Sequence, residues 1–445
     1  MPTYRITTSS ITVFAAACYL VLGDLAASAL AKNIVVTTLT DTADPPFNAD
    51  GPCGTGTISD LPGADGKVSL REAIIVANNT NGADTITFAG GGTIAVNSPL
   101  PLLCDGQTRI NGDLNDDGTP AVTLEGAALS FPAVGIGVIS SHNTITGLRI
   151  QHFPFGIVVA ALGEHQVLSH TTLTDNELKE NGFFGILLNS QGDHNVLRHT
   201  TFARNTISSN GGGILVQGGF GGADDNTLDV DIKDNTVTNN GAVGIEVVGG
   251  FDNSSSNHVD ALIRGNTLEG GHRNQGIGAI AGIGAVNFPI GASNNNVLDV
   301  TIDQNTVRNQ TGEGMYIAAG EGSPDGRPGG IADSNQMRVI VEHNTVENNP
   351  AKGIEVDAGS TGEASGNTLE VRVAHNTVCH NTDIAIRGEG GFSGDALFPP
   401  NLGTGNVLTG KIFQNTGTVV VQDGAQNGTP ENTADVRQFK NDPCS

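Results

Sequence analysis

Acidic and basic side chains recur at equivalent places in repeated segments of this chain, at a spacing that could support ion binding or proton transfer. The set consists of Asp229, Asp260, Asp299, Arg338, Glu370 and Arg372. Segments such as 226–235 and 296–305 alternate apolar with polar residues, which predicts strands whose polar side chains face outward. Carboxylates on stacked strands about 4.8 Å apart repel each other, so they require a cation between them or a raised pKa. These residues are candidate catalytic residues, and a solvated face of alternating charge is the competing interpretation.

A second outward-facing set belongs to a later strand of each repeat. Glu246, Tyr316, Glu355 and Arg387 occupy this face. An aromatic ring offers an apolar surface on which a sugar can stack, and the ionisable neighbours offer hydrogen bonds. We therefore take these residues as candidate ligand-binding residues.

The segment 113–118 matches the opening of a calcium loop, in which oxygen ligands alternate and a glycine permits the turn. Asp113, Asn115 and Asp117 would supply the ligands. The closing acid is expected at Leu124, whereas the glutamate is Glu125. The alternative is an Asx-rich turn built by the same residues. Calcium is thus a candidate cofactor, and the sequence establishes none.

Histidines also fall at equivalent places. His142, His165 and His194 each precede a polar residue that opens a repeat, and His170 and His199 share another position. Stacked histidines can bind a transition metal. Any residue that recurs at the same position of each repeat forms such a column. By default we therefore interpret these histidines as polar residues of a turn.

The cysteines are those of an exported protein. Cys53, Cys104, Cys379 and Cys444 remain once Cys18 is removed with a leader segment, and four cysteines in an exported chain favour two disulfides. Three pairings are open. Proximity in the sequence favours Cys53 with Cys104 and Cys379 with Cys444, which would fasten the two ends of the fold.

The elements that position these residues are short strands. Residues 226–235, 296–305 and 367–376 each begin and end with asparagine and alternate apolar with polar residues. A shorter strand and a Gly-Ile-Glu-Val strand follow, as at Gly244 and Gly353, so each repeat holds three short strands. No helical period of 3.6 and no regular hairpin turns are visible, which excludes helical solenoids and propellers. We predict an all-β fold, a right-handed parallel β-helix.

The asparagines themselves have a structural explanation. One column consists of Asn176, Asn205, Asn235, Asn266, Asn305, Asn344, Asn376 and Asn415. Stacked asparagines can adopt the left-handed conformation at a bend and bond their amides to the coils above and below. Their substitution should weaken the fold before it affects any activity.

The chain divides into four expected segments. Residues 1–31 resemble a secretion signal, with Arg5, an apolar run and the small residues 29–31 before a cleavage site; a retained membrane anchor is the alternative. Residues 32–142 would form an N-terminal cap and the first coils, residues 143–422 the β-helix repeats, and residues 423–445 a C-terminal tail or cap. No membrane span remains after cleavage of the signal.

The composition limits the classes of partner. The net charge is −25, and binding to nucleic acid or anionic membranes relies on clustered lysine and arginine. Nucleic acid is therefore excluded as an expected partner, whereas cations and neutral glycans fit the charge. The oligomeric state is left open.

Near the front of the chain, residues 68–74 (Val-Ser-Leu-Arg-Glu-Ala-Ile), Ala77-Asn78 and residues 82–88 resemble the "CSLREA" segment of bacterial secreted and surface β-helix proteins, with Val68 in place of the usual cysteine. The resemblance implies a pectate-lyase-like β-helix and an extracellular setting, without implying a reaction. Ser69 and Glu72 can form a capping box, so a short helix should cover the open first coil.

Two functional hypotheses follow. The first is a secreted or cell-surface protein that binds a carbohydrate or another surface ligand, as in adhesion, without catalysis. The second is a polysaccharide-active enzyme, a lyase or glycoside hydrolase. The acidic set is similar in kind to that of β-helix polysaccharide lyases, which implies calcium held by Asp229, Asp260 and Asp299 with Arg338 or Arg372 beside the sugar. The Gly-His-Gly and Asp-Pro-His-Glu signatures of such enzymes do not occur.

Overall fold

The computed structural model describes residues 31–272, 274–284, 291–322, 330–360, 363–391, 403–422 and 432–444. The expected secretion signal lies outside these residues, apart from Ala31. Within the described ranges, no helix is long and apolar enough to cross a membrane.

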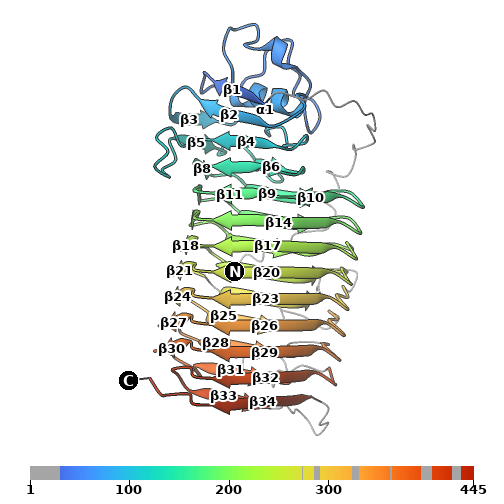
Figure 1. The fold of residues 1–445 in the computed structure, drawn as a ribbon, viewed down its shortest axis with the longest axis vertical. Coiled ribbons are helices and arrows are strands. Elements are labelled where there is room, and N and C mark those ends of the chain that lie inside the picture. The colour runs from blue at the N-terminus through green and yellow to red at the C-terminus, as the bar shows by residue number, and fades with distance from the viewer. Residues whose placement is uncertain are drawn as a thin grey trace.

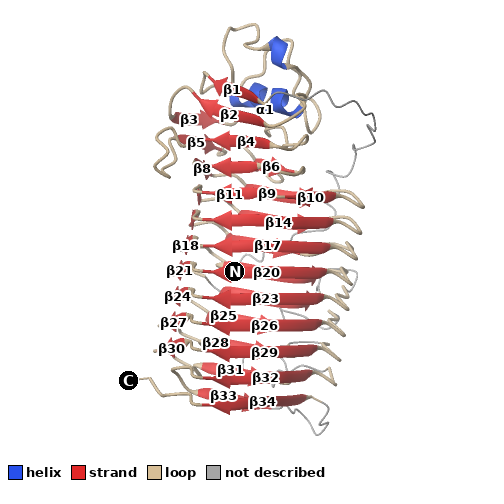
Figure 2. Ribbon diagram, in the orientation of Figure 1, coloured by secondary structure: helices blue, strands red, loops and turns tan. Residues whose placement is uncertain are grey.

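The fold is a right-handed parallel β-helix, as the sequence predicts, and Figure 1 shows its coils stacked along one long axis. The chain passes from a strand of the first sheet to one of the second and then of the third, and returns to the first sheet one coil further on. Every neighbouring pair of strands within the three sheets is parallel, for example β17 (Thr227–Lys233) beside β20 (His258–Arg264). Figure 2 shows how little of the described chain is helical.

The strands divide among three sheets. The first contains β1 (Lys32–Val36), β2 (Asp84–Phe88), β4 (Thr108–Asn111), β7 (Thr144–Thr146), β11 (Thr172–Thr174), β14 (Val196–Ala203), β17, β20, β23 (Val297–Asp303), β26 (Gln336–Glu342), β29 (Thr368–Ala374), β32 (Val407–Phe413) and β34 (Thr433–Phe439), with β10 (Val167–Ser169) beside β14. The second contains β3 (Gly92–Ala95), β5 (Val122–Glu125), β8 (Leu148–Gln151), β12 (Glu177–Lys179), β15 (Thr206–Ser208), β18 (Thr236–Thr238), β21 (Thr267–Glu269), β24 (Thr306–Arg308), β27 (Thr345–Glu347) and β30 (Thr377–Cys379). The third contains β6 (Val134–Val138), β9 (Phe155–Ala161), β13 (Phe184–Ser190), β16 (Gly212–Gln217), β19 (Ile245–Phe251), β22 (Gln275–Ile283), β25 (Glu313–Ala318), β28 (Ile354–Asp357), β31 (Ile386–Glu389) and β33 (Val419–Gln422).

The interior is a continuous stack of aliphatic side chains. Leu228, Val230 and Ile232 of β17 all have 0% exposure, and their equivalents in the neighbouring coils are buried in the same columns. Each such side chain contributes roughly 1.5–3 kcal/mol on burial. The alternation seen in the sequence therefore sets which residues point inward and which face outward.

A helix covers the N-terminal end of the stack. Helix α1 (Leu70–Asn78) lies beside β1 and β2 in Figure 1. Ser69 Oγ accepts from the N–H of Glu72 at 3.2 Å, and Glu72 Oε2 accepts from the N–H of Ser69 at 2.9 Å, so the predicted capping box is confirmed. Arg71 is buried in an ion pair of 2.8 Å with Asp41. A short 3-10 helix (Ile58–Asp60) precedes α1.

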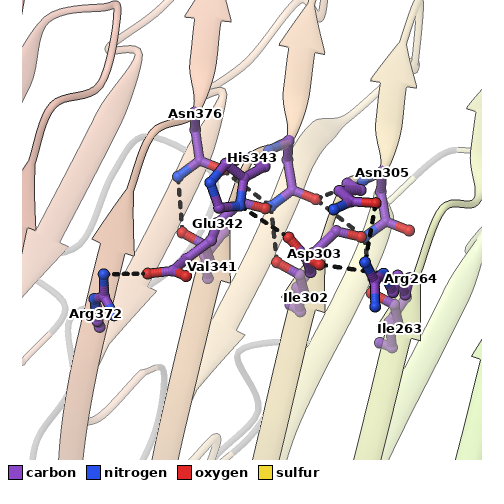
Figure 3. Close-up of polar contacts among 12 residues, drawn as sticks. Ile263, Arg264, Ile302, Asp303, Asn305, Val341, Glu342, His343, Arg372 and Asn376 are labelled. Carbon is purple, nitrogen blue, oxygen red and sulfur yellow. Dashed lines mark hydrogen bonds and ion pairs between the residues drawn. The ribbon is translucent and has the colours of Figure 1, made fainter.

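The asparagine column forms a buried hydrogen-bonded ladder (Figure 3). Asn305 Nδ2 donates to the carbonyl of Ile263 at 2.9 Å and to Asn344 Oδ1 at 3.0 Å, and Asn376 Nδ2 donates to the carbonyl of Val341 at 2.8 Å. These bonds satisfy the polar groups that the turns would otherwise bury without partners.

The expectation that the asparagines take the left-handed conformation is wrong. The residue before each asparagine carries the positive φ, for example Gln304 (57°), His343 (55°) and His375 (57°). The asparagine directs its own N–H and side chain along the stack, so the preceding residue makes the bend.

The expectation that Asn143 and Gln166, the polar residues after His142 and His165, open repeats at the same position is also wrong. Thr172 of β11 pairs with Thr144, which places Asn143 level with Thr171 rather than with Gln166. Between β14 and β17 the register shifts by one residue after Leu197. This bulge explains why β14 has eight residues and β17 has seven.

Disulfides join Cys53 to Cys104 and Cys379 to Cys444, the pairing that proximity favours. The first lies in the N-terminal cap and the second ties β30 to the C-terminal segment. The stack extends beyond residues 143–422 at both ends, since β1, β2 and β4 precede it and β34 pairs with β32.

Candidate functional site

The outward acidic set of the first sheet forms the expected column. Asp229, Asp260 and Asp299 are register partners on successive coils, and Arg338 and Glu370 continue the column. The side chains are open to solvent, with exposed fractions of 43% at Asp229 and 67% at Arg338. Burial, with the charges of Asp299 and Asp229, raises the pKa of Asp260.

The charges of this face pair with one another. Arg338 lies 3.2 Å from Glu370, Arg372 Nη2 lies 2.8 Å from Glu342 Oε1, and Arg264 lies 3.3 Å from Asp303; Figure 3 shows the last two pairs. Exposed pairs of this kind contribute about 0–1 kcal/mol each. The arrangement is a solvated face of alternating charge, and a catalytic role for these residues stays a prediction.

The Asp113 loop is organised by its own backbone. Asp113 Oδ1 accepts from the N–H of Asn115 at 3.0 Å and Oδ2 from the N–H of Gly118 at 2.7 Å, while Asp117 Oδ1 accepts from Thr119 at 2.9 Å. The backbone N–H groups lower the pKa of Asp113 against the opposing effect of burial. These are the bonds of the Asx-rich turn, and calcium binding stays a prediction.

The histidines lie at turns and stack between coils. The ring centroids of His165 and His194 are 4.8 Å apart and those of His142 and His170 are 4.7 Å apart. His142 therefore belongs to the column of His170 and His199, which corrects its assignment to that of His165. No group of three His, Cys, Asp or Glu side chains able to hold a metal occurs among the residues that the structure describes.

The third sheet brings the predicted ligand-binding set together. Glu246, Gly278, Tyr316, Glu355 and Arg387 are register partners on the outer face of β19, β22, β25, β28 and β31. Gly278 leaves room in the column, since a Cβ there would lie 3.3 Å from Glu246 Oε1. These side chains face outward because the residues before and after each of them in its strand belong to inward-facing columns.

Glu355 is the centre of a buried ionic cluster. Its exposed fraction is 2%, and Oε1 lies 2.7 Å from Lys352 Nζ and 3.9 Å from Arg387 Nη1. Lys352 also lies 3.4 Å from Glu313 Oε1, and Arg387 Nε donates to Glu389 at 2.8 Å. Burial and the charge of Glu355 raise the pKa of Glu313 well above its ordinary value.

Asp357 lies in the next outward column and is fully buried. Neither carboxyl oxygen has a hydrogen-bond partner within the described part of the chain. Burial, with the nearby charges of Glu355 and Glu389, raises its pKa well above the ordinary value. Burial thus penalises the charged form of this carboxyl group.

Two more carboxyl groups of this face titrate near neutrality. Burial raises the pKa of Glu246 to about 7, although Gln275 Nε2 donates to it at 2.8 Å. Burial and the charge of Glu246 raise the pKa of Glu321 to about 8. Tyr316 Oη bonds to Ser360 Oγ at 2.6 Å, and burial raises its pKa well above the ordinary value.

An apolar groove lies on the same sheet. It has a volume of about 350 Å³ and lies over β6, β9, β13, β16 and β19. Val158, Leu187 and Leu215 form the outward column along it, and Glu246 is the next residue of that column. The groove and the ionic cluster therefore lie along one outward column, in which Gly278 and Tyr316 separate Glu246 of the groove from Glu355 of the cluster.

Phenylalanines flank the groove. Phe155 and Phe184 lie along one side, and Gly212 makes room for the Phe184 ring, because a Cβ at that glycine would lie 2.3 Å from it. Phe220 and Phe251 stack at the other side with centroids 5.8 Å apart.

Sequence reasoning missed the groove and half of the cluster. The phenylalanines are few, but Phe155 and Phe184 are one coil apart, as are Phe220 and Phe251, and this spacing was the available signal. Nothing in the sequence indicated that Lys352 and Asp357 are buried, because their burial depends on packing over the sheet.

Comparison with known proteins supports the fold. Residues 113–268 match the family model described as "Right handed beta helix region". The matched part of the chain is a right-handed β-helix region. No curated protein sequence matches the chain.

Solved structures are similar at low identity. The Dettilon tailspike protein is 14% identical, with a TM-score of 0.42, over 87% of this chain and 68% of that one. Pectate lyase Pel9A is 10% identical, with a TM-score of 0.34, over 89% and 78%. PfbA, a surface adhesin of Streptococcus pneumoniae, is 9% identical, with a TM-score of 0.24, over 68% and 84%. At these TM-scores the similarities carry no information on activity.

Proposed function

We propose that this chain is a secreted or cell-surface β-helix protein that binds glycans on the outer face of its third sheet without transforming them. The observation that carries the proposal is that the aromatic groove and the buried polar cluster lie on one outward column of the third sheet, where Glu246 lines the groove and Gly278 and Tyr316 lead to Glu355. Sugars present apolar C–H faces and hydroxyl groups together, and ligand sites combine apolar walls with few polar groups in the same way.

The net charge of the protein limits the class of glycan that it is expected to bind. With a net charge of −25 the chain repels polyanions at long range, so neutral glycans are favoured over uronates and nucleic acids. On the third sheet itself, Lys352 and Arg387 are already held by carboxylates.

Export from the cell is part of the proposal. Two disulfides are typical of an oxidising compartment. The resemblance of residues 68–88 to the CSLREA segment supports the same setting and the secretion signal expected in residues 1–31.

The test is a screen of the mature protein against neutral and acidic polysaccharides, with and without calcium, that measures binding and product release. We expect binding without products, and a loss of at least about tenfold in affinity for Phe184→Ala, because burying a phenylalanine side chain contributes about 1.5–3 kcal/mol. Glu269→Gln on the second sheet is the matched control and should bind as the wild type does. Absence of binding to every glycan would refute the proposal.

A polysaccharide-active enzyme is the second candidate. Glu246 favours it, because a carboxyl group with a pKa of about 7 beside a groove is suited to general acid catalysis. Products whose release is abolished by Glu246→Gln would support this candidate at the third sheet. Unsaturated products abolished by Arg338→Ala would instead support the exposed first-sheet set with calcium.

A further inference from the structure

One buried polar group in the apolar groove lacks a partner among the residues that the structure describes. Asn189 of β13 lines the groove, has an exposed fraction of 3%, and its Oδ1 accepts no hydrogen bond from them. It differs from the asparagines of the ladder, each of which bonds to a neighbouring coil. A buried amide oxygen without a donor costs roughly 1–3 kcal/mol, so this oxygen is suited to a donor that a ligand brings.

The surroundings of Asn189 specify what else the ligand carries. Its register partners are Ala160 on β9 and Gln217 on β16, and the adjacent outward column is Val158, Leu187 and Leu215. Leu187 and Leu215 have exposed fractions of 9% and 8%. A ligand whose donor reaches Asn189 Oδ1 therefore meets the apolar side chains of Leu187 and Leu215 on one side and the amide of Gln217 on the next coil.

We infer that the groove recognises a neutral glycan with N-acetylated sugars, whose acetamide N–H donates to Asn189 Oδ1 while the acetamide methyl packs among Leu187 and its neighbours. The inference rests on the proposed glycan-binding function and names the substrate class of that site. An acetamide group carries both required features, an N–H donor and a methyl group joined through one carbonyl carbon, whereas a plain hydroxyl supplies a donor without the methyl.

The size and charge of the groove agree with this ligand. Small-molecule sites have volumes of about 300–1,000 Å³, and the groove has about 350 Å³. N-acetylation leaves the sugar uncharged, so no basic side chain is needed. Phe155 and Phe184 along one side supply rings for the apolar faces of the sugars.

The test uses two neutral tetrasaccharides with the same β-1,4-linked backbone, N-acetylated chitotetraose and cellotetraose. In titration calorimetry with the full chain, we expect chitotetraose to bind about tenfold more tightly. Asn189→Leu, which removes the acceptor at similar volume, should abolish this preference, and Glu269→Gln should retain it. A crystal structure of the wild type with chitotetraose should place an acetamide nitrogen about 2.9 Å from Asn189 Oδ1.

The outcomes separate the inference from the proposed function. Equal binding of the two tetrasaccharides, or an acetamide bound elsewhere in the crystal, would overturn the inference while glycan binding stands. If no glycan of either kind binds the chain, the proposed function fails and the inference fails with it. If Asn189→Leu does not fold, the wild-type comparison and the crystal structure decide the matter.

Discussion

Burial, more than residue type, determines the chemistry of single side chains on the third sheet. Glu246 and Asp260 are both outward carboxyl groups at repeat positions, yet only Glu246 has a pKa raised to about 7. The difference arises because residues pack over the third sheet, whereas the first sheet is open. A sequence shows the outward phase of a residue but not what covers it.

Glu246 makes the stability of the protein depend on pH. Its folded-state pKa of about 7 exceeds the usual 4.5, so between these values the unfolded chain releases the proton first and stability falls as the pH rises. Glu246→Gln removes this contribution. We expect the variant to gain about 2 kcal/mol relative to wild type between pH 5 and pH 8, measured by denaturant unfolding at both pH values. A constant difference would contradict the assigned pKa.

Lys352 offers a second residue-scale prediction. Lys352→Met leaves the buried Glu355 and its neighbour Glu313 without this cation, which should lower the free energy of unfolding by about 3 kcal/mol. The double variant Lys352→Met with Glu355→Gln removes one of these charges and should recover part of the loss. Guanidinium unfolding measures both, and a double variant less stable than the single one would contradict the ionic cluster.

The asparagine ladder acts at the scale of the element. Asn344 accepts from the N–H of Asn305 at 2.8 Å and donates to the carbonyl of Ile302 at 2.8 Å and to Asn376 at 3.0 Å. Asn344→Ala should destabilise the fold by about 2–4 kcal/mol, with no change in glycan affinity. The control is Asn33→Ala, an exposed asparagine of β1 that makes a surface bond. Thermal unfolding and calorimetry would show whether stability and binding separate in this way.

The strands and the helix cap were predictable because local patterns determine them. Alternation places Leu228 and Ile232 inward, and Ser69 with Glu72 starts α1. The position of Asn143 within its coil was not predictable from the recurring polar residues that open the repeats. The early coils contain the additional strand β10 and a one-residue bulge, which change the spacing. The same limit applies to the site: phase brings Glu246, Tyr316, Glu355 and Arg387 into one column, whereas the orphaned oxygen of Asn189 appears only when the coils are stacked.

The whole molecule is a one-dimensional stack, so its ends require protection. Helix α1 and the Cys53–Cys104 disulfide lie at one end, and Cys379–Cys444 fastens the other. Loss of either fastening should expose strand edges that can pair with other chains.

Removing the C-terminal disulfide tests this view. The pair is separated by 65 residues, for which loop-closure entropy gives about 4 kcal/mol. The double variant Cys379→Ala with Cys444→Ala should lower the unfolding midpoint and speed hydrogen exchange in β34, while β17 in the middle of the stack exchanges as in wild type. Equal protection of β34 in the two proteins would show that the disulfide does not hold this end.

The central claim is that the third sheet, and not the first, binds the glycan. Calorimetry with the glycan that binds best in the screen should compare Leu187→Arg, which places a charged side chain in the groove, with Thr301→Arg on the outer face of β23. We predict at least a tenfold loss of affinity for Leu187→Arg and unchanged affinity for Thr301→Arg. Unchanged affinity for Leu187→Arg, or a loss confined to Thr301→Arg, would contradict the account.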